Sequence, residues 1–364
     1  MALAVVAVPT IVIPALAPAA SVASLTLSGG AGTVTLGGAL YAKGGAVVGA
    51  DVVTSGDTGC VRLFVNGAPI GSQSNAGGGS AWHFDITTPN ATGFQQVRAT
   101  AYATSDCHGA WGSATTGFFA DSSGPRISPL VTPTPNAYGW NNSAVTVTAR
   151  TNDGGLVGVD ANSVGPRLTR LSNETSGTPV DIAASDLLGN RSLTSLTIRI
   201  DKTPPSVSVD GISNGANYIL GGVPAAGCHA SDALSGIDSC DGNAPGGVGT
   251  RTYTATAVDR AGNSSSAHVT YHVAYDFRWA GTNPASVRAG GTITFRLQLL
   301  DANGAVVQAG SAPTLVGGTG TVTWNATTHR YVVTETPAGS AGSHATVGVH
   351  LDDGTDHTFV IALT

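Results

Sequence analysis

The sequence is poor in charge, since lysine, arginine, aspartate and glutamate together make up 10% of its 364 residues. Lysine occurs only at Lys43 and Lys202, and the formal net charge is −6. Without an excess of positive charge, no broad surface for nucleic acid or an anionic membrane is expected. We therefore predict that nucleic acid is not a partner.

Helical periodicity is also absent, and alternation with a period of two takes its place. Valine and alanine alternate with threonine around Val145 and Val147, and Ile293, Phe295 and Leu297 alternate with polar residues. Such alternation is typical of strands with one buried face. Pairs such as Asn66–Gly67, Asn303–Gly304 and Asp353–Gly354 follow these runs and favour tight hairpin turns. The sequence predicts an all-β chain of repeated sandwiches.

Two phrases occur twice in the same order. "DSSGPRIS" begins at Asp121 and "DKTPPSVS" at Asp201, which is 80 positions later. "ASDLLGN" begins at Ala184 and "AVDRAGN" at Ala257, which is 73 positions later. Proline favours an extended segment before a strand, and Asp with Gly favours a turn. We interpret the first phrase as a module boundary and the second as the last hairpin turn of a module.

These boundaries predict four modules after a leader. The predicted segments are a signal-peptide-like segment 1–23 and immunoglobulin-like β-sandwiches at 24–120, 121–200, 201–274 and 275–364.

The N-terminal segment is uncharged and apolar, and it ends in small residues. Ser21 and Ala23 suit the positions before a signal-peptidase cleavage site. A transmembrane anchor is the alternative, but Pro9, Pro14 and Pro18 disfavour a stable spanning helix. We predict a signal peptide, a secreted or cell-surface location and no membrane span in the mature chain.

The four cysteines contain no Cys-x-x-Cys pair, which disfavours a zinc knuckle or a thioredoxin-type site. An even number of cysteines in a β-rich chain suits disulfides in an oxidising compartment. Pairing within predicted modules gives Cys60–Cys107 and Cys228–Cys240.

A family resemblance follows from "DKTPPSVSVDG", "CHASDALSGIDSC" and "GTRTYTATAVDRAGNSSSAHVTYHV". These stretches resemble the Ig-like and hyalin-type repeats of secreted bacterial proteins. The last module, with "YDFRW", "SVRAG" and "LDDGTDHTF", resembles the bacterial Ig-like domain named for a Pro-x-Lys-Phe motif, although that motif is absent here. The resemblance implies an extracellular array of β-sandwiches and no particular ligand.

Several residues are candidates for chemistry. Asp232, Asp238 and Asp241 surround the Cys228–Cys240 loop, where carboxylate oxygens suit calcium. The alternative is that Asp232 and Asp238 form turns beside Ser235 and Gly236. The Asp186 and Asp259 side chains are interpreted as structural parts of the hairpin turns.

Two further patterns are weaker. "GISNG" at 211–215 matches the nucleophile elbow of hydrolases, but no helix pattern follows it. A cluster near the C-terminus suits zinc or copper, although an outward polar hairpin face is the favoured interpretation. Its members are His344, His350, Asp352, Asp353, Asp356 and His357. No cofactor is predicted.

The five tryptophans have two interpretations, core packing or a platform on which sugars stack. Core packing is expected for most of Trp82, Trp111, Trp140, Trp279 and Trp324. A carbohydrate-binding module would instead show two or more solvent-facing aromatic residues on one surface.

The sequence as a whole predicts a monomeric, non-enzymatic protein that acts as a structural or adhesive spacer. Its partner would be an extracellular protein or glycan. A carbohydrate- or cell-wall-binding accessory array is the alternative, and a hydrolase is the least favoured function.

Overall fold

A computed structural model describes residues 20–55, 58–75, 79–109, 111–154 and 156–364. All regular secondary structure in this part of the chain is β-strand. No helix in the described ranges is both long and apolar enough for a bilayer span. The predicted signal peptide falls mostly on residues 1–19, which lie outside the described residues.

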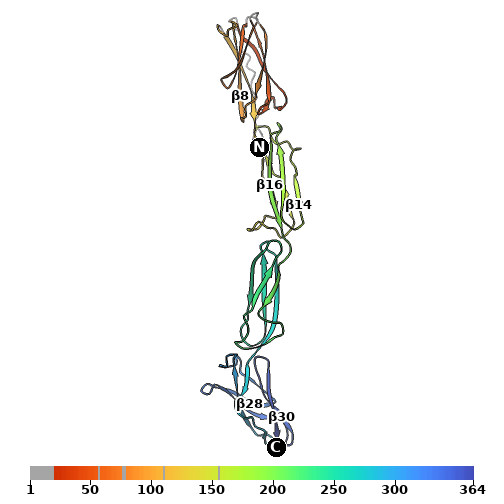
Figure 1. Cartoon of the computed structure of the whole chain (residues 1–364), viewed down its shortest axis with the longest axis vertical. Coiled ribbons are helices and arrows are strands. Elements are labelled where there is room, and N and C mark those ends of the chain that lie inside the picture. Colours follow the sequence, from red (N-terminus) through yellow and green to blue (C-terminus); the bar gives the residue numbers. More distant parts are fainter. Residues whose placement is uncertain (1–19, 56–57, 76–78, 110, 155) are drawn as a thin grey trace. The chain divides into compact units, whose positions relative to one another are not determined.

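The contacts divide the chain into two compact units, Met1–Pro135 with Ser143–Ile200, and Asn136–Asn142 with Asp201–Thr364. Within the first unit, the first nine strands form one sandwich (Figure 1). They are β1 (Val22–Gly29), β2 (Thr33–Leu36), β3 (Ala39–Lys43), β4 (Val47–Thr54), β5 (Cys60–Val65), β6 (Ala68–Ser74), β7 (Ala81–Thr87), β8 (Gly93–Tyr102) and β9 (Trp111–Asp121). One sheet has the order β1-β4-β7 and the other β2-β3-β9-β8-β5-β6. Side chains from both sheets, including Val52, Leu63, Trp82 and Phe118, form a single core.

The rest of the first unit contains seven shorter or paired strands. They are β10 (Arg126–Ile127), β11 (Leu130–Thr132), β12 (Val145–Thr148), β13 (Thr151–Asn152), β14 (Leu168–Leu171), β15 (Thr175–Ser185) and β16 (Arg191–Ile200). The sheets are β10-β13, β11-β12-β14 and β15-β16. Val145 and Val147 from β12 meet Ile182 from β15 and Ile198 from β16 in a second core.

In the second unit, the first six strands form a sandwich with its own core. They are β17 (Ser206–Asp210), β18 (Asn217–Ile219), β19 (Gly227–Ser231), β20 (Ile237–Asn243), β21 (Gly249–Asp259) and β22 (Ser264–Ala274). The sheets are β17-β19 and β18-β22-β21-β20. Tyr253, Tyr271 and Val273 are buried between them.

The last nine strands form another sandwich in the second unit. They are β23 (Asp276–Trp279), β24 (Ser286–Val287), β25 (Ile293–Leu300), β26 (Val306–Val307), β27 (Thr314–Val316), β28 (Gly318–Asn325), β29 (Arg330–Pro337), β30 (His344–His350) and β31 (Asp356–Leu363). One sheet has the order β23-β25-β29-β28 with β26 on β25, and the other β24-β31-β30-β27. Ile293, Phe295 and Leu297 face this core, as their alternation predicts.

The predicted turns have the backbone geometry that their residues favour. Asn66 and Gly67 both have positive φ, at 49° and 84°, between β5 and β6. Gly189 and Gly262, the glycines of the repeated hairpin phrase, have φ of 80° and 93°. The β15–β16 and β21–β22 hairpins therefore turn where the repeated phrase places the turn.

Both predicted disulfides are present. Cys60–Cys107 ties β5 to the loop between β8 and β9, and Cys228–Cys240 ties β19 to β20. The all-β prediction of tandem β-sandwiches is confirmed. The boundaries at 24, 121, 201 and 275 stay predictions, and β1 begins at Val22, two residues before the first of them.

Candidate functional site

The two repeated phrases meet in space, and an aspartate of the boundary phrase lies at the centre of each meeting point. Asp201 is fully buried. Its Oδ2 accepts the N–H of Ser235 at 2.9 Å, and its backbone carbonyl accepts Nδ2 of Asn263 at 3.0 Å. Asn263 also donates from Nδ2 to Oδ2 of Asp259 at 2.9 Å. Boundary and hairpin are thus joined by one amide side chain.

The same arrangement occurs around Asp121 at the other boundary. The Asp121 side chain is fully buried, and its Oδ2 accepts the N–H of Leu156 at 3.1 Å. Nδ2 of Asn190 donates to the Asp121 carbonyl at 3.0 Å and to Oδ2 of Asp186 at 2.6 Å. The repetition of the phrases therefore reflects a repeated three-dimensional motif.

A third carboxylate completes each cluster. The first triad is Asp121, Asp153 and Asp186, and the second is Asp201, Asp232 and Asp259. In each triad the ligand atoms lie within 4.8 Å of one another. Asp121, Asp186, Asp201 and Asp259 are all at most 2% exposed.

The second triad concentrates negative charge in a poorly solvated place. Within the described part of the chain, no lysine or arginine forms an ion pair with Asp201, Asp232 or Asp259. Backbone N–H groups partly compensate, because Oδ1 of Asp232 accepts from Leu234 and Gly236. Several carboxylate oxygens that converge at this distance can hold a hard divalent cation such as Ca²⁺. All three residues of the triad are aspartates, and the triad therefore contains no histidine or cysteine that would favour a softer metal.

Asn141 lies beside the second triad. Its backbone carbonyl accepts the N–H of Asp201 at 2.9 Å. The Asn141 side chain is 4% exposed, and its Nδ2 has no hydrogen-bond partner among the described residues. Turning the amide by half a rotation exchanges this nitrogen for Oδ1, which is a suitable ligand atom for a hard cation.

The three calcium candidates predicted from the loop are not brought together as one group. Asp232 lies in the second triad, whereas Asp238 and Asp241 lie on the edge strand β20. The Tyr138 hydroxyl donates to Asp238, and this hydrogen bond raises the pKa of Tyr138. The triad members Asp121, Asp153 and Asp201 were not singled out from the sequence, although the repeated phrases contain two of them.

Members of the C-terminal histidine and aspartate cluster contact their own hairpin and the segment around strand β23. Nδ1 of His350 lies 2.6 Å from Oδ1 of Asp356. The His357 ring stacks on Phe277 with centroids 3.6 Å apart, and burial lowers its pKa. Asp353 is buried and accepts the N–H of Tyr275 at 2.9 Å. His350 and Asp356 are exposed, whereas Asp353 is buried, so only part of the cluster lies on an outward polar face.

The "GISNG" segment has no elbow geometry. Gly211–Gly215 forms the connection from strand β17 to strand β18, where an elbow requires a helix. The Ser213 N–H donates to the Tyr218 hydroxyl at 3.2 Å. This segment is therefore a loop between strands.

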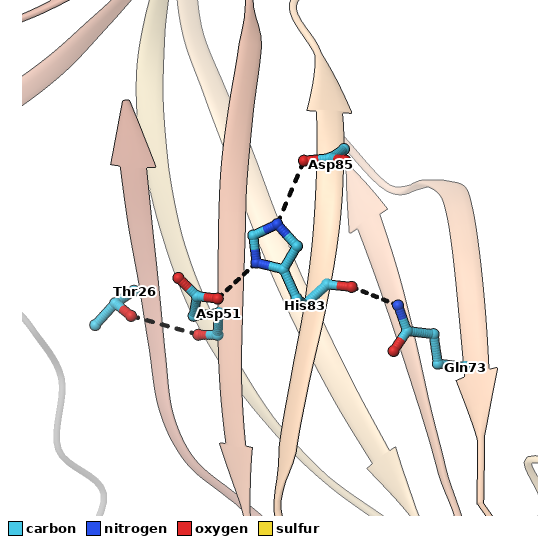
Figure 2. Close-up of polar contacts among 5 residues, drawn as sticks. All are labelled: Thr26, Asp51, Gln73, His83 and Asp85. Carbon is cyan, nitrogen blue, oxygen red and sulfur yellow. Dashed lines mark hydrogen bonds and ion pairs between the residues drawn. The ribbon is translucent and has the colours of Figure 1, made fainter. Parts of the chain in front are cut away.

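A histidine that sequence reasoning missed lies on the open face of sheet β1-β4-β7. Figure 2 shows the His83 ring between Asp51 and Asp85, with Nδ1 at 2.6 Å from Asp51 Oδ1 and Nε2 at 3.3 Å from Asp85 Oδ1. The hydrogen bond with Asp51 is the largest cause that raises the pKa of His83. Since both ring nitrogens already contact carboxylates, this group suits cross-strand pairing better than catalysis.

The tryptophans divide as expected, with one exception. Trp82 and Trp140 are buried, and Trp279 and Trp324 pack against the last core. Trp111 is 58% exposed on β9.

Comparison with known proteins gives similarity to solved structures only. No protein-family model matches the chain. No curated protein matches it. A tetra-tandem repeat from the extending region of a large adhesion protein is 16% identical, with a TM-score of 0.31, and covers 87% of this chain and 95% of that one. A bacterial ice-binding adhesin is 14% identical, with a TM-score of 0.26, and covers 94% of this chain and 98% of that one.

Fibronectin(III)-like modules of CbhA from Clostridium thermocellum are also similar. They are 15% identical with a TM-score of 0.21, over 48% of this chain and 94% of theirs. At such low identities and TM-scores, these similarities carry no information on what this chain binds or does.

Proposed function

We propose that this chain is an exported, non-enzymatic repeat protein of the cell exterior that acts as a structural or adhesive spacer. The observation that carries the proposal is the boundary motif, which is built twice from the same residue types. At the first boundary, Asp121 is the last residue of β9 and pairs with Lys43, yet its carbonyl and carboxylate bind Asn190 and Leu156. No flexible residue separates the strand from these contacts.

A boundary of this kind suits a spacer. A Gly- or Ser-rich linker would let consecutive modules move independently, whereas a boundary residue built into the next sandwich restricts that motion. At the second boundary, Asp201 directly follows the end of β16 at Ile200 and is bound by Ser235 and Asn263. Two disulfides, each within one sandwich, fit an oxidising exterior.

We infer hyalin-type repeats in the middle of the chain and a C-terminal module of the type named for Pro-x-Lys-Phe, on the resemblances given above. We also infer that the protein is secreted or on the cell surface, that it is monomeric, and that its partner is an extracellular protein or glycan.

A second candidate function is cation binding at the boundaries, and the burial of the two triads favours it. Carboxylates held together away from water repel one another unless a cation or protons compensate the charge. We propose that each triad holds one hard divalent cation. The ligands of the two sites would be Asp201, Asp232 and Asp259, and Asp121, Asp153 and Asp186. A bound cation would stiffen the boundary that the spacer needs.

The spacer function is tested by locating the protein and measuring its dimensions. Protease shaving and antibody labelling of intact source cells should reach the chain, and scattering from the purified chain should give an extended particle with a narrow size distribution. A chain confined to the cytoplasm with four reduced cysteines would contradict the proposal. So would a compact particle.

A further inference from the structure

The outward face of sheet β2-β3-β9-β8-β5-β6 carries an unusual concentration of aromatic residues. Successive side chains of a strand point to opposite faces, so the strand register decides which residues share this face. Trp111 pairs with Tyr102, and Phe119 pairs with both Phe94 and Tyr41. Phe64 lies on the same face, opposite Arg98. Six of the chain's 21 aromatic residues are therefore on one sheet face.

We call this surface the aromatic–arginine face. Its members are Tyr41, Arg62, Phe64, Phe94, Arg98, Tyr102, Trp111 and Phe119. Trp111 is 58% exposed and Phe94 is 43% exposed, so these rings are available to solvent. This is the arrangement that distinguishes a carbohydrate-binding module from a bare spacer.

The rings at one end of the face support one another. Tyr41 and Phe119 stack with centroids 5.2 Å apart, and Phe94 meets Phe119 edge to face at 5.3 Å. Phe94 also covers Gly117, where an added Cβ would lie 2.2 Å from the ring. A glycine at this position lets the phenylalanine ring lie close to the sheet.

Two arginines occupy the middle of the face. The Arg98 guanidinium lies 4.5 Å from the Phe64 ring centroid, and that of Arg62 lies 5.7 Å from the Tyr102 centroid. Within the described ranges, neither arginine forms an ion pair with a carboxylate. A guanidinium held over a ring keeps its N–H donors for a ligand, and it matches carboxylate and phosphate groups in a bidentate geometry.

Several positions paired with the arginines carry small hydroxyl side chains, although Thr100 is only 4% exposed. Ser72 and Thr100 flank Arg62, and Thr115 is opposite Arg98. The one acidic residue in register on this face, Asp121, is fully buried at the end of β9 and belongs to the first triad. The face is therefore locally positive, although the chain as a whole carries a net charge of −6.

We propose that the aromatic–arginine face binds a polysaccharide that carries carboxylate or phosphate groups. Sugar rings present C–H groups that pack on aromatic rings, while the acidic groups pair with Arg62 and Arg98. Between the Phe94 and Tyr102 positions β8 extends by eight residues, or about 27 Å. That length suits several units of an extended chain and exceeds what a single sugar needs.

Other partners fit this surface less well. A protein interface would favour a well-packed, desolvated apolar centre, whereas small hydroxyl side chains such as Ser72 and Thr115 lie beside the arginines of this face. Single-stranded nucleic acid also stacks on aromatic rings, but it requires a positive groove along its backbone. The proposal rests on the adhesive function proposed above, because it gives that function a partner of defined chemistry.

The test uses the purified full chain and four probes, namely polygalacturonate, poly(glycerol phosphate), neutral dextran and a thymidine oligonucleotide. Binding is measured by calorimetry and by retardation in gels that contain each polymer. We expect binding of the acidic polysaccharide or the phosphate polymer, weakened by salt, and weaker binding of dextran. Trp111→Ala and Arg98→Gln should each reduce the affinity about tenfold, which corresponds to about 1.4 kcal/mol. Leu193→Ala and Arg191→Gln, at exposed positions on β16, are the matched controls and should change nothing.

Three results would overturn the proposal. The first is equal affinity for dextran and the acidic polymers, together with an unchanged affinity of the Arg98→Gln variant. The second is tighter binding of the oligonucleotide than of any polysaccharide. The third is that a folded chain binds none of the probes. The location of the protein on intact cells and its dimensions in solution are independent of these results. Failure of the binding proposal is thus distinguishable from failure of the spacer function.

Discussion

Nδ2 of Asn190 donates a hydrogen bond to the backbone carbonyl of Asp121 across 69 residues of sequence. The equivalent pair, Asn263 and Asp201, makes the same bond over 62 residues and at the same distance of 3.0 Å. The asparagine that ends the hairpin phrase therefore binds the aspartate that begins the boundary phrase. Since the two phrases depend on each other structurally, they recur together.

Removing this amide should destabilise the module that follows the boundary. Asn190 is 6% exposed, and Asn190→Ala leaves the Asp121 carbonyl and one Asp186 oxygen without their donor. We expect a loss of about 2 kcal/mol in the free energy of unfolding, because buried acceptors without partners are costly. Denaturant unfolding of the full chain measures this loss. Asn162→Ala, at an exposed position, is the control, and an equal effect of both substitutions would contradict the role of the Asn190 amide.

Much of the fold could be predicted from the sequence because its signals are local. Alternation around Val145 and Ile293, and turn pairs such as Asn66–Gly67, depend only on neighbouring residues. The triads could not be predicted in full, because their members come from strands and loops far apart in the chain. Asp153 lies outside both repeated phrases, and only the tertiary fold brings it close to Asp121.

The aromatic–arginine face was missed for a different reason. Trp111 and Phe119 are eight positions apart on β9, which a strand pattern places on one face. Whether that face points to the core or to solvent depends on the pairing of β9 with β8 and β3. Alternation along β9 does not show which of its two faces is buried. Core packing is therefore the expectation from sequence for most of the tryptophans.

Calcium should stabilise the chain through the triads. At a concentration 100-fold above its dissociation constant, a cation that binds only the folded state adds about 2.7 kcal/mol for a single site. The Asp153→Asn/Asp232→Asn double variant keeps side-chain size but removes one negative charge from each triad. We expect it to lose most of the calcium-dependent rise in melting temperature.

The matched control for calcium is the Asp238→Asn/Asp241→Asn double variant. It removes the same number of charges from β20, outside the triads. Calorimetric titration of both variants against the unmodified chain separates site binding from general charge screening. Equal responses to calcium in the two double variants would show that the triads are structural and bind no cation.

The disulfides should contribute unequally to stability. Cys60–Cys107 closes a separation of 47 residues and Cys228–Cys240 one of 12. The loop-entropy model gives about 4 and about 3 kcal/mol for these closures. Denaturant unfolding of Cys60→Ala/Cys107→Ala and Cys228→Ala/Cys240→Ala measures each contribution, and peptide mapping of the unreduced chain checks the pairing. Recovery of a Cys107–Cys228 link, or of free thiols from exported protein, would refute the assignment.

Glu335 should make the last sandwich less stable at neutral pH than in mild acid. This side chain is fully buried on β29 beside Gly318, where an added Cβ would lie 2.5 Å from Oε1. Neither carboxylate oxygen has a well-formed hydrogen bond to a described residue. Burial raises the pKa of Glu335 to about 7, and the backbone N–H of Gly348 has a smaller, opposite effect.

The sign of the pH dependence follows from this raised pKa. Between the ordinary glutamate value of 4.5 and about 7, the folded chain keeps a proton that the unfolded chain releases. The contribution of Glu335 to stability is therefore most favourable below pH 4.5 and falls as the pH rises through 7, by roughly 3 kcal/mol in total. Glu335→Gln should remove this dependence and stabilise the chain at neutral pH. Urea unfolding between mild acid and neutral pH compares the two proteins, with the exposed Glu174→Gln as control. Parallel pH curves for Glu335→Gln and the unmodified chain would show that Glu335 is not the titrating group.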